Sequence, residues 1–201
     1  MTRILIAEDQ AMVRGALTTL LELEGDFEVV AEVSRGDEVL EAARRASPDV
    51  ALLDIEMPGA TGLQAAELLA RELPSCRVLI LTTFGRPGYL RRAMEGGAAG
   101  FVLKDAPAAE LARAIRGVLR GERVVDPALA AAALSQGECP LTPREREVLL
   151  AGREHATIAE IAAALYLSPG TVRNHLSSVM QKLDARNRAE AIRLAEERGW
   201  L

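Results

Sequence analysis

The chain has 201 residues, a length that suits one large domain or two small ones. Its composition, 49% hydrophobic and 26% charged with few aromatic residues, is typical of a soluble globular protein and not of a disordered one. No apolar run approaches the roughly 20 residues that span a bilayer, and the acidic Glu8 and Asp9 come too early for a signal peptide. We therefore expect a cytoplasmic protein.

Cysteine, lysine and net charge are each distributed in an informative way. Cys76 and Cys139 are the only cysteines and form no C-x-x-C pattern, so neither a disulfide framework nor a zinc site is indicated. Among the 24 basic residues, only Lys104 and Lys182 are lysines. The net charge of −5 divides into −6 over residues 1–140 and +1 over residues 141–201, too little to identify a DNA-binding protein by charge alone.

Residues 1–120 alternate short β-branched runs with amphipathic helical stretches, whose spacing is clearest over Leu111–Leu119. Five strands that are each followed by a helix predict an α/β domain with a doubly wound parallel sheet covered on both faces. The candidate strands are Arg3–Ala7, Glu28–Val33, Val50–Leu53, Val78–Leu81 and Gly100–Leu103.

The pattern changes after residue 120. Residues 121–140 are less periodic and predict a linker with a short helix at Pro127–Leu134. Residues 141–201 predict an all-α domain, which begins with a capping box at Thr142-Pro143-Arg144-Glu145. Thr157 and Ser168 occupy further N-cap positions. The four expected helices are Pro143–Arg153, Ile158–Leu165, Pro169–Leu183 and Arg188–Glu197.

Polar side chains follow four of the five predicted strands. Because ligands bind at the carboxyl ends of the strands in such a sheet, these residues should gather at one edge. Clustered acids suit Mg²⁺, and a carboxylate beside Mg²⁺ and a lysine suits phosphoryl transfer. Any single acid here could instead be an ordinary helix cap or loop residue. The residues are Glu8 and Asp9 after the first strand, Asp54 after the third, Thr82 and Thr83 after the fourth, and Lys104 after the fifth.

The run Asp54-Ile55-Glu56-Met57-Pro58-Gly59, with Glu8-Asp9 before it and Thr82 and Lys104 after it, resembles the receiver domain of two-component response regulators. The resemblance implies the strand order 2-1-3-4-5. It also implies that Asp54 is the phospho-acceptor and that Glu8, Asp9, Asp54 and the backbone carbonyl of Glu56 hold Mg²⁺. Thr82 and Phe101 would form the switch pair and Lys104 would bind the phosphate, although Phe101 can also be read as simple core packing.

The second and third helices of the C-terminal domain are joined only by Tyr166-Leu167-Ser168, which is helix-turn-helix geometry. Within Pro169–Leu183, the apolar residues at Val172, Leu176, Val179, Met180 and Leu183 should face the core. The opposite stripe carries side chains that suit base edges, although it can also be an ordinary solvated face. This stripe comprises Arg173, Asn174, Ser177 and Gln181, and the residues better placed for phosphates are Thr171, His175 and Lys182.

The motifs Leu141–Leu149, Ala159–Ala162, Ser168–His175 and Lys182-Leu183 resemble the LuxR-type helix-turn-helix, and a receiver joined to it is the architecture of the NarL/FixJ family. The resemblance implies that Arg173, Asn174 and Ser177 face bases, with Thr171, His175 and Lys182 near the DNA backbone.

Where the family usually has glycine, this chain has Arg153-Glu154-His155-Ala156, so we expect a positive φ at His155. Neither His155 nor His175 has a partner at metal-ligand spacing. The segments 82–89 and Gly199-Trp200 most resemble the DesR-like branch, whose members answer a membrane-fluidity sensor kinase.

The resulting hypothesis is a phosphorylation-controlled transcriptional regulator. A cognate sensor histidine kinase would phosphorylate Asp54, and the receiver would then form a homodimer that binds paired operator half-sites in double-stranded DNA. The helices expected at Gln10–Leu23 and Leu111–Leu119 could supply the dimer interface. The only enzymatic chemistry expected is self-phosphorylation and slow self-dephosphorylation. The alternatives are an enzyme that hydrolyses phosphoesters and a regulator that works without phosphorylation.

Overall fold

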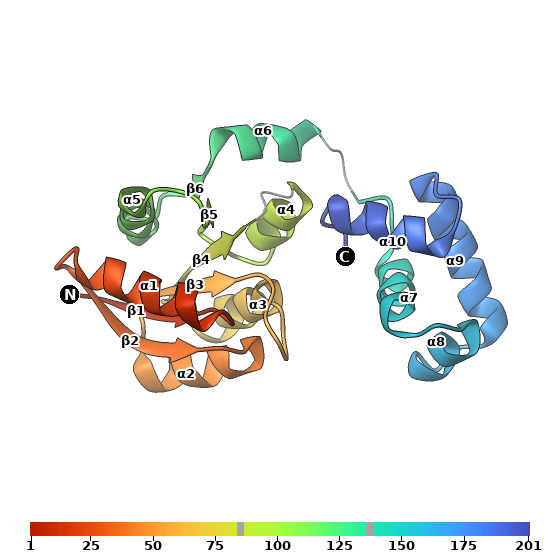
Figure 1. Ribbon diagram of the computed structural model, residues 1–201, viewed down its shortest axis with the longest axis horizontal. Helices are drawn as coiled ribbons and strands as arrows, with labels where there is room; N and C mark the ends of the chain where they lie inside the picture. Colours follow the sequence, from red (N-terminus) through yellow and green to blue (C-terminus); the bar gives the residue numbers. More distant parts are fainter. Residues whose placement is uncertain (84–86, 136–138) are drawn as a thin grey trace. The chain divides into compact units, whose positions relative to one another are not determined.

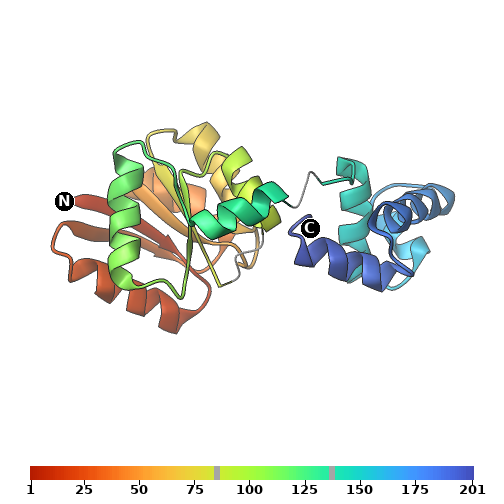
Figure 2. The same ribbon diagram turned by 90° about the horizontal axis from the view of Figure 1, so that it is seen from above.

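The computed structural model describes residues 1–83, 87–135 and 139–201. The chain forms two compact units that divide near residue 131, one built on a sheet and one entirely helical (Figures 1 and 2). Among the described residues, no helix combines the length and the apolar character that a membrane-spanning segment requires.

The first unit is built on a sheet in which all neighbouring strands are parallel. The strand order is β2-β1-β3-β4-β5-β6, so the predicted order 2-1-3-4-5 is confirmed. The strands are β1 (Thr2–Ala7), β2 (Phe27–Val33), β3 (Val50–Asp54), β4 (Arg77–Thr82), β5 (Gly100–Leu103) and β6 (Val124–Val125).

The sixth strand corrects the expected count of five and lies in the segment expected to be a linker. Val124 pairs with Gly100 and Val125 with Phe101, and the Val124 N–H donates to the Ala99 carbonyl at 3.2 Å. Val124 also packs, partly buried, against the hydrophobic core. The chain therefore adds a short strand to the β5 edge before it continues into the next helix.

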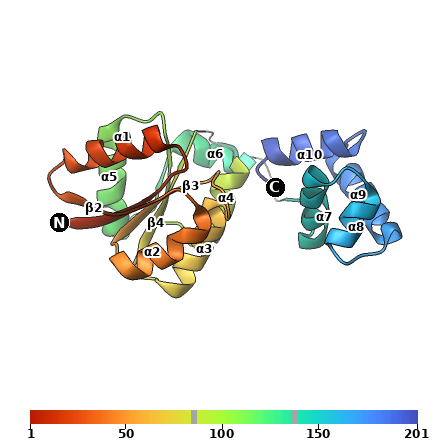
Figure 3. The ribbon, with the colours of Figure 1, turned by 60° about the horizontal axis from the view of Figure 1, so that its bottom comes forward.

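Helices cover both faces of the sheet, with α1 and α5 on one face and α2 and α3 on the other (Figure 3). Side chains alternate between the two faces along a strand, so Ile4 and Ile6 of β1 pack with Leu111 and Ile115 of α5 in one buried cluster. The helices are α1 (Ala11–Glu22), the short 3₁₀ helix η1 (Gly36–Glu38), α2 (Val39–Ala46), α3 (Gly62–Glu72), α4 (Pro87–Glu95), α5 (Ala108–Leu119) and α6 (Pro127–Ser135).

The second unit contains α7 (Pro143–Glu154), α8 (Ile158–Ala164), α9 (Pro169–Leu183) and α10 (Arg188–Glu197), which confirms the four expected helices. The predicted caps are confirmed too: Thr142 and Thr157 form capping boxes, and the Ser168 hydroxyl accepts a hydrogen bond from the Thr171 N–H. These caps satisfy backbone N–H groups that a helix start leaves without partners. The apolar stripe of α9 is buried as expected, at Val172, Leu176, Val179 and Leu183.

The expectation of a positive φ at His155 is wrong. His155 has φ −114° and ψ 127°, because α7 ends one residue earlier and the chain leaves it in an extended conformation. A positive φ occurs instead at Tyr166, at 54°, in the turn between α8 and α9. The next N–H, that of Leu167, donates to the Ala162 carbonyl at 2.8 Å, which closes this turn and directs the chain into α9.

Candidate functional site

The topology of the sheet brings the predicted polar residues of the first unit to one edge. Glu8 and Asp9 follow β1, Asp54 ends β3 and Thr82 ends β4. Asp54 pairs in register with Leu81 and Thr82 with Leu103, so the ends of the central strands lie level with one another. Lys104 directly follows β5, and its N–H donates to the Thr82 carbonyl at 2.8 Å, which holds the Lys104 backbone beside β4.

Lys104 joins the acids across this edge. Its Nζ lies 3.0 Å from Asp54 Oδ2 and 2.6 Å from Glu8 Oε2, and all three side chains are at least nine-tenths buried. Burial alone would lower the pKa of Lys104, but the two carboxylates outweigh it and the pKa is raised. The lysine is therefore a fixed positive charge between Glu8 and Asp54.

Asp54 is held by its own loop as well as by Lys104. The Ile55 N–H donates to Asp54 Oδ1 at 2.8 Å, and the Gly62 N–H donates to the Ile55 carbonyl at 3.0 Å. A Cβ at Gly62 would lie 1.9 Å from the Asp54 carbonyl oxygen, so α3 can begin here only with glycine. Burial, helped by the neighbouring Glu8 carboxylate, raises the pKa of Asp54 despite the opposing effects of Lys104 and the Ile55 N–H. Sequence reasoning missed Gly62, because nothing in the sequence reports such a close approach.

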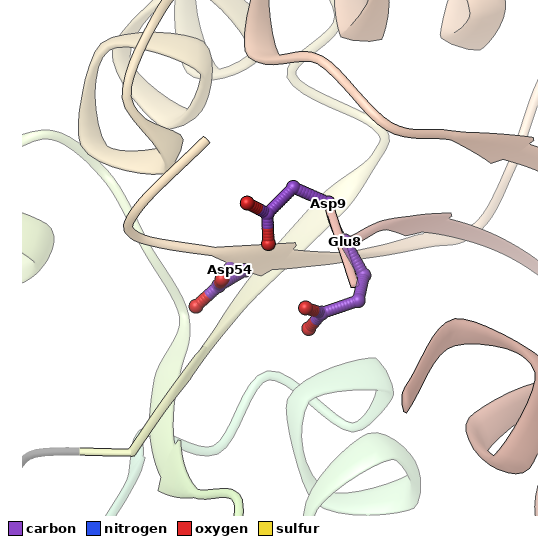
Figure 4. A group of neighbouring side chains, drawn as sticks. All are labelled: Glu8, Asp9 and Asp54. Atoms are coloured by element: carbon purple, nitrogen blue, oxygen red, sulfur yellow. The ribbon is translucent and has the colours of Figure 1, made fainter. Parts of the chain in front are cut away.

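The acidic side chains offer oxygen ligands to a cation. Glu8, Asp9 and Asp54 each have a carboxylate oxygen within 4.8 Å of those of the other two, and Figure 4 shows them at the ends of β1 and β3. The buried Glu8 Oε2 has the Lys104 ammonium 2.6 Å away as its counter-charge and accepts no other hydrogen bond within the described part of the chain. Clustered carboxylates offer the oxygen ligands that a hard divalent cation prefers.

A small hollow opens over these residues. Its volume is about 100 Å³, and it is lined by Asp9, Gln10, Asp54, Glu56, Thr82, Thr83 and Lys104. Thr82 is buried beside it, whereas the Thr83 and Glu56 side chains are exposed. Pockets that bind small organic molecules usually measure about 300–1,000 Å³. The hollow is therefore much smaller than the pocket that an organic substrate requires.

Phe101 lies on the strand that leads to Lys104. Its side chain is buried, and the residue pairs in register with Ile80 of β4 and Val125 of β6. This burial fits both interpretations of Phe101, as part of a switch and as simple core packing.

The α9 helix of the second unit presents two kinds of polar residue. Arg173, Asn174, Ser177 and Gln181 are exposed, whereas Thr171 and His175 are half-buried. The Thr171 and Ser168 hydroxyls lie 2.8 Å apart at the start of the helix. The predicted stripe is therefore open to solvent along one side of α9.

Lys182 is placed differently from the other predicted DNA-binding residues. Its Nζ lies 2.7 Å from Oε2 of the buried Glu145, on α7, and the Ser178 hydroxyl donates to Glu145 Oε1 at 2.6 Å. Burial would raise the pKa of Glu145, but Lys182, Ser178 and Thr142 together lower it to about 2. Sequence reasoning identified Glu145 only as a capping residue, although the rarity of lysine in this chain marked residue 182.

Two protein families match these two units. The response regulator receiver domain matches residues 4–116, and the luxR family of bacterial regulatory proteins matches residues 139–195. The fold and its carboxylate cluster therefore define a response regulator, in which a receiver domain precedes a LuxR-type DNA-binding domain.

Similar proteins extend this result to the whole chain. The transcriptional regulatory protein DesR of Bacillus subtilis is 47% identical and covers 100% of this chain and 99% of its own length. The response regulator RamR of Streptomyces coelicolor is 43% identical over 100% of this chain and 98% of its own. The crystal structure of the response regulator ChrA of a heme-sensing two-component system is 33% identical, with a TM-score of 0.58 over 99% of this chain and 98% of its own.

The chain belongs to the NarL/FixJ family of two-component response regulators and, within it, to the DesR-like branch; it is a DNA-binding transcriptional regulator. Residues 84–86 of the segment that indicated this branch, and residues 136–138 of the expected linker, lie outside the described residues.

Proposed function

We propose that phosphorylation of Asp54 controls how the C-terminal domain binds DNA. A cognate histidine kinase donates the phosphoryl group: an Asp54 carboxylate oxygen forms a bond to phosphorus while the bond from phosphorus to the kinase histidine breaks and leaves its electron pair on nitrogen. The observation that carries this proposal is the position of Asp54, buried between Lys104 and the Ile55 N–H at the floor of the hollow. In slow self-dephosphorylation, a water oxygen then forms a bond to phosphorus while the bond from phosphorus to the Asp54 oxygen breaks, which releases inorganic phosphate and restores the carboxylate.

Mg²⁺ is the cofactor we propose for this site. Glu8, Asp9 and Asp54 would hold it together with the backbone carbonyl of Glu56, and the hollow beside the exposed Asp9 and Glu56 leaves room for waters as further ligands. When bound, Mg²⁺ supplies charge neutralisation for the incoming phosphoryl group. The donor set supports this choice, because its side chains offer oxygen only.

Lys104 and Thr82 would bind the new phosphoryl oxygens. The Lys104 ammonium already contacts Asp54, and its flexible stem lets it follow the added negative charge. The Thr82 hydroxyl lines the same hollow and can donate a hydrogen bond to an oxygen placed there. Movement of Thr82 toward the phosphate would give Phe101, on the neighbouring strand, space to change its rotamer and so repack the surface around β4 and β5.

The size of the hollow favours this account over an enzyme that hydrolyses phosphoesters. A volume of about 100 Å³ can take a phosphoryl group, whereas an organic phosphoester needs a pocket several times larger. The intact set of Asp54, Thr82 and Lys104 likewise favours control by phosphorylation over a regulator that works without it.

The α9 helix is the recognition helix of this proposal. Arg173, Asn174 and Ser177 would reach base edges in the major groove, because they are exposed and their donors and acceptors suit such contacts. Thr171 and His175, beside the N-terminus of the same helix, would contact phosphates. The sequence also suggested a phosphate contact for Lys182, but its ammonium is paired with Glu145.

We propose that dimerisation couples phosphorylation in the first domain to DNA binding in the second. We take the domains as residues 1–120 and 141–201, with a linker between them. The helix α1 exposes Met12 and Leu20, and Leu23 follows its end; their exposed fractions are 86%, 43% and 78%. Leu119, at the end of α5, is 38% exposed. Apolar surface of this kind suits a second copy of the chain, and two linked DNA-binding domains would then meet paired half-sites.

Acetyl phosphate with Mg²⁺ provides the test. The intact mass of the chain should rise by one phosphoryl group, the increase should decay slowly, and Asp54→Asn should abolish it. Persistent labelling of Asp54→Asn would refute the assignment, and sustained turnover of para-nitrophenyl phosphate would favour the hydrolytic enzyme instead.

A further inference from the structure

The two lysines of the chain share one structural setting. Lys104 contacts the buried carboxylates of Glu8 and Asp54, and Lys182 contacts that of Glu145. Arginine supplies every other basic side chain apart from the two histidines. An ammonium is a compact point charge, whereas a guanidinium is a broad planar fork. Lysine is therefore found where a cation must fit closely against a buried carboxylate.

Glu145, on α7, contacts two residues of the recognition helix α9, Ser178 and Lys182. Its Oε1 accepts from the Ser178 hydroxyl at 2.6 Å, and its Oε2 is 2.7 Å from Lys182 Nζ. Residues four apart share one face of a helix, so Ser178 and Lys182 approach the carboxylate side by side. The Thr142 N–H donates to the same Oε2 at 2.7 Å, which fixes Glu145 to the start of α7.

We infer that Lys182 is a positioning residue, which sets the rotation of the recognition helix through Glu145 and does not neutralise a DNA phosphate. This inference rests on the proposed role of α9 in reading DNA. Glu145 remains ionised at neutral pH, since its pKa is lowered to about 2. Lys182 is itself exposed, with 33% of its side chain accessible, but its ammonium is paired with the buried Glu145 carboxylate, so a DNA phosphate would meet a nearly neutral pair.

Arg173 provides the contrast on the same helix. It is exposed, and it has no ion pair within residues 1–83, 87–135 and 139–201. Nine residues separate Arg173 from Lys182, which is two and a half turns of an α-helix, so the two side chains leave α9 in opposite directions. Lys182 therefore lies on the side of α9 opposite Arg173, where its ammonium contacts Glu145 of α7.

The salt dependence of DNA binding separates the two roles. The full chain, treated with acetyl phosphate and Mg²⁺, is titrated with a labelled duplex selected from a random-sequence pool and with a random duplex, at several KCl concentrations. Each lost phosphate contact reduces the slope of log K against log salt by about 0.9. Lys182→Met should weaken binding of the selected duplex by about three- to tenfold with the slope unchanged. The binding of the random duplex should change less.

Arg173→Met is the matched comparison, because Arg173 is proposed to reach a base edge: it should weaken binding of the selected duplex by about 5- to 150-fold and that of the random duplex far less. A slope reduced by about 0.9 in Lys182→Met would overturn the inference, since it would identify Lys182 as a phosphate contact. If Arg173→Met leaves the binding of both duplexes unchanged, the proposed reading face of α9 is wrong, and the role given to Lys182 falls with it.

A second pair of variants distinguishes a specific effect on DNA binding from a loss of folding. Lys182→Met alone leaves the Glu145 carboxylate buried without its cation, whereas Glu145→Gln with Lys182→Met restores neutrality. The double variant should therefore bind the selected duplex more tightly than Lys182→Met alone, with Trp200 fluorescence reporting that the C-terminal core is intact. Strictly additive effects of the two substitutions on binding would contradict a positioning role of Lys182 that acts through Glu145.

Discussion

Gly62 lies so close to the backbone of Asp54 that no side chain fits between them. Gly62→Ala would place a Cβ 1.9 Å from the Asp54 carbonyl oxygen, and the shift needed to relieve this clash should lower the free energy of unfolding by about 1–3 kcal/mol. Chemical unfolding followed by circular dichroism checks this. Gly15→Ala is the matched control, because a Cβ added at Gly15, in α1, has no neighbouring atom within 4 Å. That control should raise stability by about 0.5–1 kcal/mol, and equal losses in both variants would contradict the account.

Glu145 makes the stability of the C-terminal domain depend on pH. Its pKa falls from 4.5 to about 2 on folding, so its contribution is fully present above pH 4.5 and is lost as pH falls toward 2. The difference between these two values corresponds to roughly 3 kcal/mol. Trp200 is the only tryptophan and lies in the C-terminal core, so its fluorescence reports on this domain.

Glu145→Gln isolates this contribution from those of other acids. Unfolding by urea should show the wild-type chain more stable than the variant at pH 6, with the difference shrinking steadily between pH 4.5 and pH 2. A difference that stays constant over this range would mean that the Glu145 carboxylate is not stabilised by Lys182 and Ser178.

At the scale of elements, the N-cap of the recognition helix offers a direct test. Ser168→Ala removes the hydroxyl that accepts from the Thr171 N–H at 3.0 Å, and should cost about 1 kcal/mol of stability. Ser177→Ala, at an exposed position of the same helix, should change stability by less than about 0.5 kcal/mol. Urea unfolding followed by Trp200 fluorescence compares the two, and similar losses would show that the cap is not what stabilises α9.

Periodicity and capping chemistry predicted most of the elements. The five long strands and the helices α7 to α10 lie within one or two residues of their expected ends, because alternation of apolar residues and N-cap side chains are local signals. The strand β6 has only two residues, too few for a periodic pattern, and forms because the β5 edge is available for pairing. His155 has a negative φ because the chain leaves α7 in an extended conformation there, which the sequence pattern did not indicate.

Some contacts of the functional residues could be predicted from the sequence, and others could not. Residues at strand ends could be expected to meet, because parallel topology determines where the ends lie, and the structure does bring Glu8, Asp9, Asp54 and Lys104 together. The contact of Lys182 with Glu145 could not be expected, since 37 residues separate the two and helix periodicity does not say which helices pack. The same holds for the approach of Gly62 to Asp54.

At the scale of the whole molecule, a dimer should form when Asp54 is phosphorylated. Light scattering of the chain with acetyl phosphate and Mg²⁺ should give twice the mass of the untreated chain. Leu23→Glu should prevent this doubling, because it places a charge in an apolar surface that is 78% exposed in the monomer. Leu150→Glu, a similar change on α7 at 46% exposure, is the control and should leave the doubling intact. A chain that stays monomeric after labelling would remove dimerisation from the mechanism.

The central claim is that a phosphoryl group on Asp54 controls DNA binding. The most direct measurement is the fluorescence anisotropy of a selected duplex titrated with the full chain, with and without acetyl phosphate and Mg²⁺, for the wild type and Asp54→Asn. Phosphorylation should tighten wild-type binding by about 30- to 150-fold, the ratio that roughly 2–3 kcal/mol of differential interaction produces, and leave Asp54→Asn unchanged. Equal wild-type affinities in the two conditions, or the same gain in Asp54→Asn, would contradict the claim.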